Sequence, residues 1–410
     1  MSLDKKRSIF ALLALALSAF AIGTTEFISV GLLPMIAEDL SISVKVAGLT
    51  VSLYALGVMF GAPVLTSLTA KMPRKSLLLW IMVIFILGNS IAALATSVEM
   101  LLLARVISAL AHGIFMAIGA TIAADLVPEN RRASAIAIMF TGLTVATVTG
   151  VPFGTFIGQL FGWRFAFIAI VVIGIIAFIG NSLLVPADLQ KAAKTTMKDQ
   201  LKLVTNARIL LVLIITALGY GGTFVVFTYL SPLLQEVSGF SAESVTWILL
   251  VYGLAIAIGN TIGGKLADRN PIKALFYMFI IQAIVLAVLS VAAPFKVAAL
   301  ATILLMGLFA FMNVPGLQVY VVMLAERFVP GAVDVASALN IAAFNAGIAL
   351  GAFLGGIVAD SYGLLNTAWV GALMVLGAVI LTFISRVLET KDIKADSRFG
   401  RPLKKQTADS

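Results

Sequence analysis

The sequence predicts an all-α integral membrane protein with 12 transmembrane helices in two pseudo-symmetric six-helix bundles. Three observations predict this fold class: an apolar composition, a succession of long apolar runs, and an internal repeat. Of the 410 residues, 61% are hydrophobic and 11% are charged, and the mean hydropathy is +1.10. Soluble domains carry about 25% charged residues, so the composition alone excludes an ordinary water-soluble protein.

Twelve apolar runs are long enough to cross a bilayer, for which about 20 residues suffice. They lie near 8–33, 46–69, 76–95, 99–126, 133–160, 164–186, 208–234, 244–265, 273–293, 297–325, 334–360 and 364–387. The first run resembles a signal peptide at its start, but it continues past the cleavage-like Ala19-Phe20-Ala21 to Pro34. That is longer than the apolar region of a signal peptide, so we interpret it as a retained helix.

The formal net charge of +9 reports topology and not nucleic-acid binding. If the N-terminus is cytoplasmic, the cytoplasmic segments hold all 28 Lys and Arg side chains except Lys45, Arg105, Arg164 and Lys296. Such an excess places both termini in the cytoplasm. The chain has no cysteine and a single histidine, His112, so we expect no disulfide framework, no metal site and no cofactor.

The repeat relates two halves of the chain. At an offset of 198 residues, Gly23 aligns with Gly221, and Pro34, Tyr54 and Lys75 align with Pro232, Tyr252 and Lys273. Near the fifth and eleventh runs the offset becomes 201, where Gly150, Gly154 and Gly162 align with Gly351, Gly355 and Gly363. We therefore predict an N-terminal bundle at 1–186, a cytoplasmic linker at 187–207, a C-terminal bundle at 208–388 and a cytoplasmic tail at 389–410. Parallel repeats of this kind form transporters that bind substrate near the midplane between the halves.

Glu26 is the only acidic residue well inside an apolar run. A carboxylate at bilayer depth costs roughly 2.5–3.5 kcal/mol on insertion scales, so it marks a functional site by default. Its counterpart in the repeat is Phe224, so the ionisable group exists in only one half. We predict proton handling in the first half and recognition of substrate shape in the second.

The fourth run carries Arg105 and His112 on one helix face, since seven residues correspond to about 700° of rotation and about 10.5 Å of rise. Counted from the outer ends of their runs, with Pro34 as the outer end of the first, Glu26 and Arg105 lie at depths within about 3 Å of one another. We predict that Glu26, Arg105 and His112 couple transport to protons, with Glu26 and Arg105 as an exchangeable pair or relay. Two alternatives stay open: Glu26–Arg105 could be a static salt bridge, and His112 could be hydrogen-bonded packing.

Candidate substrate-binding residues are the polar, aromatic and Met side chains of the inner runs. They are Tyr54, Phe115, Met116, Tyr220, Phe227, Tyr252, Asn260, Asn313, Gln318, Asn340 and Asn345. The apolar members would form an adaptable wall. For any single Asn or Gln, an ordinary hydrogen bond between helices is the competing interpretation.

Two motifs predict gating elements. The fifth run contains Gly150-Val151-Pro152-Phe153-Gly154, in which glycines four apart allow close helix packing and Pro152 bends the helix. The loop after the eighth run reads Gly263-Gly264-Lys265-Leu266-Ala267-Asp268-Arg269, whereas its first-half copy has Ala70 in place of the Asp. A tight helix crossing and a solvated charged turn, respectively, are the competing interpretations.

These segments together resemble the major facilitator superfamily, in particular its twelve-span drug:proton antiporters such as bacterial arabinose- and drug-efflux permeases. The resemblance rests on GTTEFISVGLLP near Glu26, the Arg105…His112-Gly113 helix, GVPFG from Gly150 and GGKLADR from Gly263, and it covers about residues 8–388. It implies the fold of that superfamily and a bacterial inner-membrane transporter that exports a small molecule in exchange for protons. It also implies that Asp268 and Arg269 latch a cytoplasmic gate.

We therefore expect proton-coupled efflux of a small amphipathic or neutral organic molecule, such as a drug, sugar or nucleoside, by a monomer. The first alternative is uptake or facilitated diffusion in which Glu26 binds substrate and moves no proton. The second is an intramembrane enzyme, which one His and no Cys do not support. The sequence contains no Gly-x-x-x-x-Gly-Lys-[Ser/Thr] nucleotide-binding motif.

Overall fold

The computed structural model describes residues 5–69, 72–128, 132–187, 189, 203, 205–267, 270–329 and 333–398. Within these ranges it contains twelve helical spans long and apolar enough to cross a membrane. The first six are α1 (Lys5–Asp39), α2 (Val44–Thr69), α3 (Arg74–Ala93), α4 (Val98–Asp125), α5 (Arg132–Phe161) and α6 (Trp163–Leu184).

The second half begins with α8 (Ala207–Phe227), which the short α9 (Leu230–Pro232) and the π-helical turn η2 (Leu233–Val237) extend. It continues with α10 (Ala242–Ala267), α11 (Pro271–Ala292), α12 (Lys296–Ala310), α13 (Asn313–Phe328), α14 (Val333–Tyr362), the turn η3 (Leu364–Asn366) and α15 (Thr367–Arg398). α12 and α13 together make one span. These twelve spans confirm the predicted fold class.

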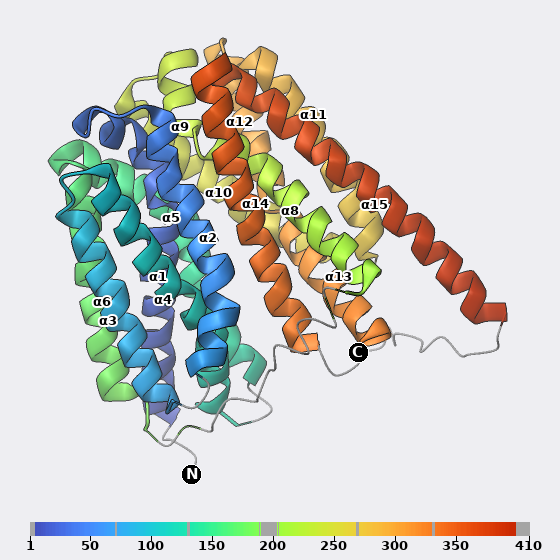
Figure 1. The fold of residues 1–410 in the computed structure, drawn as a ribbon, viewed down its shortest axis with the longest axis horizontal. Helices are drawn as coiled ribbons and strands as arrows, with labels where there is room; N and C mark the ends of the chain where they lie inside the picture. Colours follow the sequence, from blue (N-terminus) through green and yellow to red (C-terminus); the bar gives the residue numbers. More distant parts are fainter. Residues whose placement is uncertain are drawn as a thin grey trace.

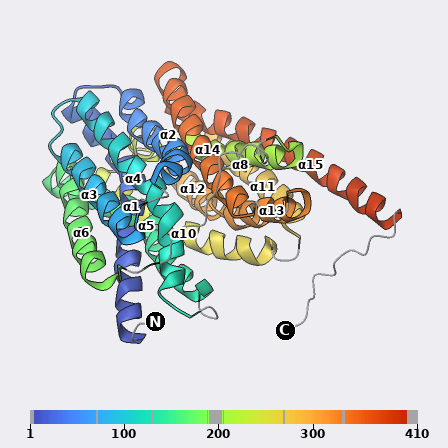
Figure 2. The same ribbon diagram turned by 60° about the horizontal axis from the view of Figure 1, so that its bottom comes forward.

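The helices form two groups that stand side by side, α1–α6 in one and α8–α15 in the other (Figures 1 and 2). Both groups use the same internal pairing: α1 packs on α5 as α8 packs on α14, and α3 packs on α6 as α11 packs on α15. Most of the predicted linker, 187–207, lies outside the described residues. α15 runs to Arg398, into the segment predicted as the tail.

Two glycines confirm the repeat at the level of backbone conformation. Gly162 between α5 and α6 has φ +94°, and Gly363 after α14 has φ +88°. Side chains rarely adopt this left-handed region, so glycine suits both turns. The two positions are the partners that the 201-residue offset pairs, which shows that the repeat extends to the turns between helices.

The first helix is longer than the sequence predicts. α1 continues through Pro34 to Asp39, so Pro34 is not its outer end and the depth that we counted from it was wrong. A proline removes one backbone donor and crowds the carbonyl four residues earlier, but packing can carry a membrane helix across that defect. α1 packs over its length against α5, which provides such support.

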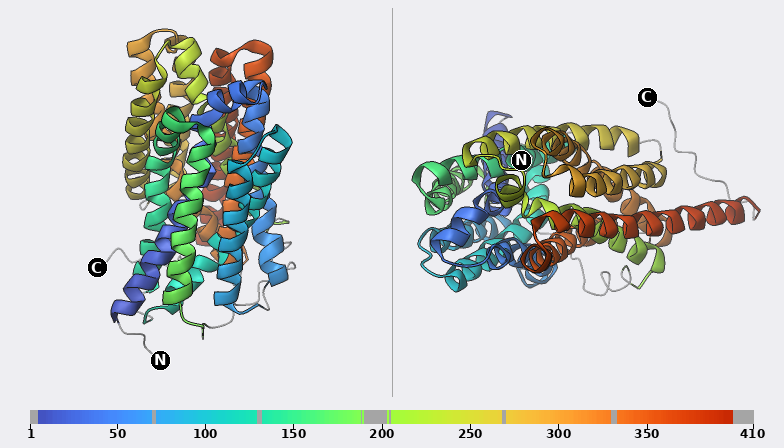
Figure 3. Two further views of the ribbon diagram at one scale, coloured as in Figure 1. Left: turned by 90° about the vertical axis from the view of Figure 1, so that its left-hand side faces the viewer. Right: turned by 90° about the horizontal axis from the view of Figure 1, so that it is seen from above.

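The start of α1 and the end of α15 point towards the same end of the molecule, here called the terminal face (Figures 1 and 3). The opposite face carries Asp39 and the start of α2. The two groups adjoin through α2 with α14 and through α5 with α10, and they diverge towards the terminal face (Figure 1). Large apolar side chains such as Trp80, Ile176 and Phe383 are exposed on the outside, as expected of a surface that faces lipid.

Candidate functional site

Arg105 is the centre of a buried polar cluster between α1, α2 and α4. It is only 1% exposed. Its guanidinium donates to three backbone carbonyls: Nη1 to Thr25 O at 2.7 Å, Nη2 to Glu26 O at 3.3 Å and Nε to Thr50 O at 3.0 Å. The same guanidinium lies 4.0 Å above the centre of the Tyr54 ring. Carbonyl dipoles and an aromatic face thus replace the water that the cation loses on burial.

Glu26 lies beside this cluster, but it does not form the ion pair with Arg105 that the sequence predicts. Arg105 contacts the backbone carbonyl of Glu26, and no ion pair within 4.0 Å joins the two side chains in the described chain. Electrostatic interaction nevertheless links the Glu26 carboxylate to Arg105, Tyr54 and Tyr220. The Glu26 side chain is only partly buried, although its neighbours Thr25 and Phe27 are buried.

His112 completes the cluster on α4. The Tyr54 hydroxyl and His112 Nδ1 lie 3.2 Å apart and share a hydrogen bond. Tyr54 also packs with Val58 and Ala109 in a small buried apolar cluster. The structure therefore brings Glu26, Arg105 and His112 together, and it adds Tyr54, which we had assigned to substrate binding, as the side chain that joins Arg105 to His112.

An aromatic cluster joins the two groups of helices directly beside Glu26. The ring centroid of Phe27 on α1 lies 6.5 Å from the ring centroids of Phe224 and Phe227 and 6.2 Å from that of Phe311. In the second group, Tyr220 contacts Phe224, Phe311 and Phe344 at 4.9–5.2 Å. Sequence reasoning missed Phe27, Phe311 and Phe344, although the alignment of Glu26 with Phe224 pointed to this place.

Tyr252 and Asn345 bring unpartnered polar atoms close to the same cluster. The Tyr252 ring stacks on Phe227 at 5.3 Å, and Asn345 follows Phe344 on α14. Neither the Tyr252 hydroxyl nor Asn345 Oδ1 has a hydrogen-bond partner in the described protein. A buried polar group without a partner costs about 1–3 kcal/mol, so these atoms, with Tyr220 and Phe227, keep a proposed role in binding.

Three other candidates form hydrogen bonds between helices of the second group, although Asn313 Oδ1 has no partner in the described protein. Asn340 accepts from Thr216 Oγ1 at 2.8 Å and donates to Gln318 Oε1 at 2.8 Å. Asn313 donates to Gln282 Oε1 at 3.0 Å. For Asn313, Gln318 and Asn340 the competing interpretation, hydrogen bonds between helices, fits better because each is engaged on a neighbouring helix.

The remaining candidates are not tied to the cluster by any contact of the described residues, and their predicted roles stay predictions. Phe115 is fully buried against the Met139 side of α5, and Met116 packs partly buried against the same core. Asn260 Oδ1 has no partner in the described protein, but nothing places it at the cluster. Asp268 and Arg269, the predicted gate residues, lie outside the described residues.

The glycine motif of α5 packs directly against α1. A Cβ at Gly150 would lie 3.2 Å from Thr24 Cα, and one at Gly154 would overlap the Ile28 side chain. Gly142 faces the backbone of Ala16 in the same way. Pro152 lies within α5. The motif therefore packs α5 tightly against the helix that carries Glu26, as the tight-crossing interpretation predicts, and its gating role stays a prediction.

Contacts between the two groups extend from mid-depth to the opposite face. Lys45 and Asp360 form an ion pair of 3.2 Å, and Thr246 donates to Gln159 Oε1 at 3.1 Å. Near mid-depth, a Cβ at Gly253 would overlap the Val148 backbone.

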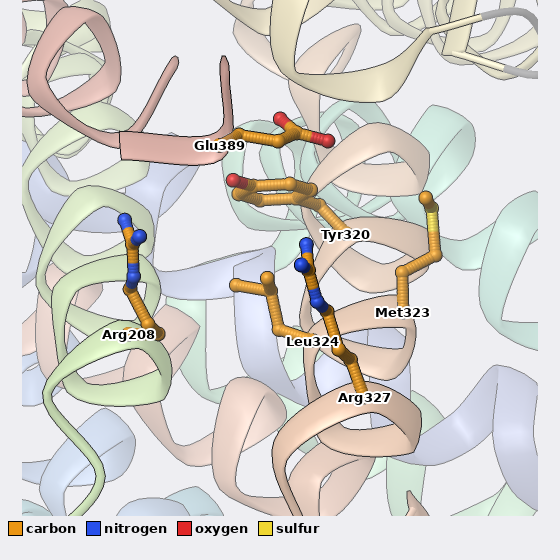
Figure 4. A pocket seen from close by; sticks show the side chains of 6 residues that line it. All are labelled: Arg208, Tyr320, Met323, Leu324, Arg327 and Glu389. Carbon is orange, nitrogen blue, oxygen red and sulfur yellow. The ribbon is translucent and has the colours of Figure 1, made fainter. Parts of the chain in front are cut away.

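A separate polar pocket lies within the second group near the terminal face (Figure 4). It is lined by Arg208 at the start of α8, by Tyr320, Met323, Leu324 and Arg327 of α13, and by Glu389 of α15. The Tyr320 hydroxyl lies 2.9 Å from Ser385 Oγ. The first group contributes nothing to it, so it is not the site between the halves.

A sequence profile described as the Major Facilitator Superfamily matches residues 15–327. The chain belongs to the major facilitator superfamily. It is therefore a membrane transporter and not an enzyme. The sequence-based resemblance to this superfamily is confirmed, and the relatives include efflux-type proteins.

Three relatives cover nearly the whole transporter. The chain is 74% identical to the uncharacterized MFS-type transporter YtbD of Bacillus subtilis (strain 168), over 96% of this chain and 99% of that protein. It is 38% identical to the inner membrane transport protein YdhP of Escherichia coli (strain K12), over 92% and 96%. It is 33% identical to a chloramphenicol resistance protein of Streptomyces lividans, over 93% and 98%.

A solved structure shares the fold. It is a bacterial homologue of the human lysosomal transporter Spinster, crystallised in an inward-facing and unoccupied conformation. The match has a TM-score of 0.72 and 17% sequence identity and covers 93% of this chain and 96% of that one.

Proposed function

We propose that this transporter exports a small amphipathic or neutral organic molecule in exchange for protons, with Glu26 as the proton-carrying group. The observation that carries the proposal is the position of Glu26. Glu26 as a whole is only partly buried, and it lies next to Phe27 and interacts with Tyr220, two members of the aromatic cluster that joins the two halves. It has no ion-pair partner in the described chain, so it can take up and release a proton without breaking a salt bridge.

The aromatic cluster supports an amphipathic or neutral substrate. Rings of Phe27, Tyr220, Phe224, Phe227 and Phe311 offer apolar faces, and the Tyr252 hydroxyl offers a hydrogen bond. Ligand sites are commonly apolar with a few placed polar groups. The one carboxylate leaves room for at most a single positive charge, and the chloramphenicol resistance relative makes chloramphenicol a reasonable first probe.

Topology supports export from the cytoplasm. We propose that the terminal face is cytoplasmic, which the Lys and Arg distribution supports, and the groups diverge towards that face (Figure 1). We propose a monomer in the bacterial inner membrane, in line with the relative named as an inner membrane transport protein.

The test uses purified protein in liposomes with an imposed pH gradient. Chloramphenicol, tetraphenylphosphonium, L-arabinose and uridine are added separately, and proton flux is followed with an internal pH dye. We expect at least one compound to drive proton counterflow through wild type and through Glu38→Gln, an exposed acid on the same helix, but not through Glu26→Gln. Substrate movement without proton flux in wild type would favour facilitated diffusion, and coupled flux through Glu26→Gln would refute the role of Glu26.

A further inference from the structure

Arg105 and Glu26 are neighbours, yet the guanidinium is directed at backbone carbonyls and not at the carboxylate. A charge-assisted bond between a guanidinium and a carboxylate is about twice as strong as one between neutral groups. Some feature must therefore hold the Arg105 guanidinium away from the Glu26 carboxylate. The backbone carbonyls alone are not that feature, because they are the weaker acceptors.

Tyr54 supplies the constraint. Its ring lies under the guanidinium at 4.0 Å, and its hydroxyl is tied to His112 Nδ1 at 3.2 Å. Below the ring, Gly57 approaches Ala109 so closely that a Cβ would lie 2.6 Å from the Ala109 methyl group. α2 and α4 are thus in close contact next to Tyr54, and this packing restricts the orientation of its ring.

The repeat offers an internal comparison. The counterpart of Tyr54 is Tyr252, which stacks on Phe227 and whose hydroxyl has no partner in the described protein. Among the described residues of the second half no Arg is buried, and the chain's single His is His112 of the first half. The hydroxyl-to-imidazole bond therefore belongs to the half that carries Arg105, as expected if the bond serves Arg105.

We propose that Tyr54 and His112 are a positioning pair that holds the Arg105 guanidinium on the carbonyls of α1 and α2 and so keeps it from forming an ion pair with Glu26. The proposal deepens the proposed function. It rests on that function only in assuming that an unpaired Glu26 carboxylate serves to carry protons. It assigns to His112 a role through Tyr54 and not a step in proton transfer. It also explains why a buried cation can lie next to Glu26 without capturing it.

The test reads the protonation of Glu26 without any substrate. Dicyclohexylcarbodiimide modifies protonated carboxyl groups in apolar surroundings, and mass spectrometry measures the labelled fraction of the Glu26 peptide against pH. The ionisable groups that interact with Glu26 in the described chain are Arg105 on α4, Tyr54 on α2 and Tyr220 on α8. Releasing Arg105 towards the carboxylate favours the charged form, so the labelling midpoint should move to lower pH by about one to three units.

Four test variants and one control, all of the full chain, make the test specific. We expect the full shift for Tyr54→Leu, which removes the ring, and a smaller, equal shift for Tyr54→Phe and His112→Ala, which each remove only their shared hydrogen bond. The Tyr54→Phe/His112→Ala double variant should match either single one. Tyr320→Phe is the control, because it loses a buried phenol bond to Ser385 Oγ within the second group, and its midpoint should not move.

Two results would overturn the proposal. One is an unchanged midpoint in Tyr54→Phe and His112→Ala, which decide the matter even if Tyr54→Leu does not fold. The other is a shift in Tyr54→Leu that persists when Arg105 is also replaced by Gln, since Tyr54 would then not act through Arg105. Because labelling needs neither substrate nor a proton gradient, it can support the positioning pair even if the transport assay shows no proton exchange.

Discussion

The Lys45–Asp360 ion pair links the two halves at the face opposite the terminal face. Its loss should favour conformations in which the two halves separate at that face. Its side chains are 40% and 41% exposed, and exposed pairs of this kind contribute about 0.2–1 kcal/mol. Since about 1.4 kcal/mol is a tenfold change in an equilibrium constant, Asp360→Asn should raise the population open at this face by about 1.4- to 5-fold. The contacts of Gln159 with Ala242 and Thr246 remain, so the change should not exceed this range.

Electron paramagnetic resonance distances between two spin labels measure that population. Labels at Glu38→Cys and Glu243→Cys report across the opposite face, where both side chains are exposed, and the native chain has no cysteine to add background. We expect the longer distance to gain population in Asp360→Asn. The charge swap Lys45→Asp/Asp360→Lys should restore the native distribution.

Salt provides an independent control. At about 1 M salt the Debye length is about 3 Å, so 1 M NaCl should move the native protein towards the distribution of Asp360→Asn and should have little effect on that variant. The reasoning is refuted if Asp360→Asn leaves the distances unchanged, or if salt moves the variant as far as it moves the native protein.

Three further predictions concern stability, and each is measured by thermal unfolding in detergent. Gly142→Ala should cost about 1–3 kcal/mol by overpacking, because its Cβ would overlap the Ala16 carbonyl, whereas Gly264→Ala, with 3.8 Å to Pro315, should change little. Asn340→Leu should cost about 1–3 kcal/mol per orphaned partner while leaving the affinity for substrate unchanged; a change in affinity alone would contradict a structural role. Arg74→Ala should cost about 3–5 kcal/mol, since its 2.7 Å ion pair with Asp125 is largely buried, and the double alanine variant should be more stable than either single one.

Composition and periodicity were sufficient for the helices. Bilayer thickness sets the length of each apolar run, so the spans agree with the structure within a few residues at most ends. The error at Pro34 came from treating a local backbone defect as a helix end. Whether a helix continues through a proline depends on the helix that packs against it, here α5 against α1, and no local pattern contains that information.

The candidate site was predicted less completely. Glu26, Arg105 and His112 could be singled out because charge inside an apolar run is costly wherever it faces. The neutral residues could not be sorted in this way: Asn340 and Asn345 look alike in sequence, but only Asn340 bridges to neighbouring helices. Their roles depend on which helix faces which, a property of packing between distant segments.

The sequence by itself therefore determines twelve membrane spans, two related halves and one acidic residue at a depth where burial of a carboxylate is unfavourable. All three follow from hydrophobicity and spacing along the chain. Only the folded arrangement decides that Arg105 binds carbonyls and not the Glu26 carboxylate, and that Phe27 meets the rings of the other half. The physical reason is that a guanidinium or an aromatic ring interacts only with groups within a few ångströms of it. Tertiary packing alone determines which groups those are.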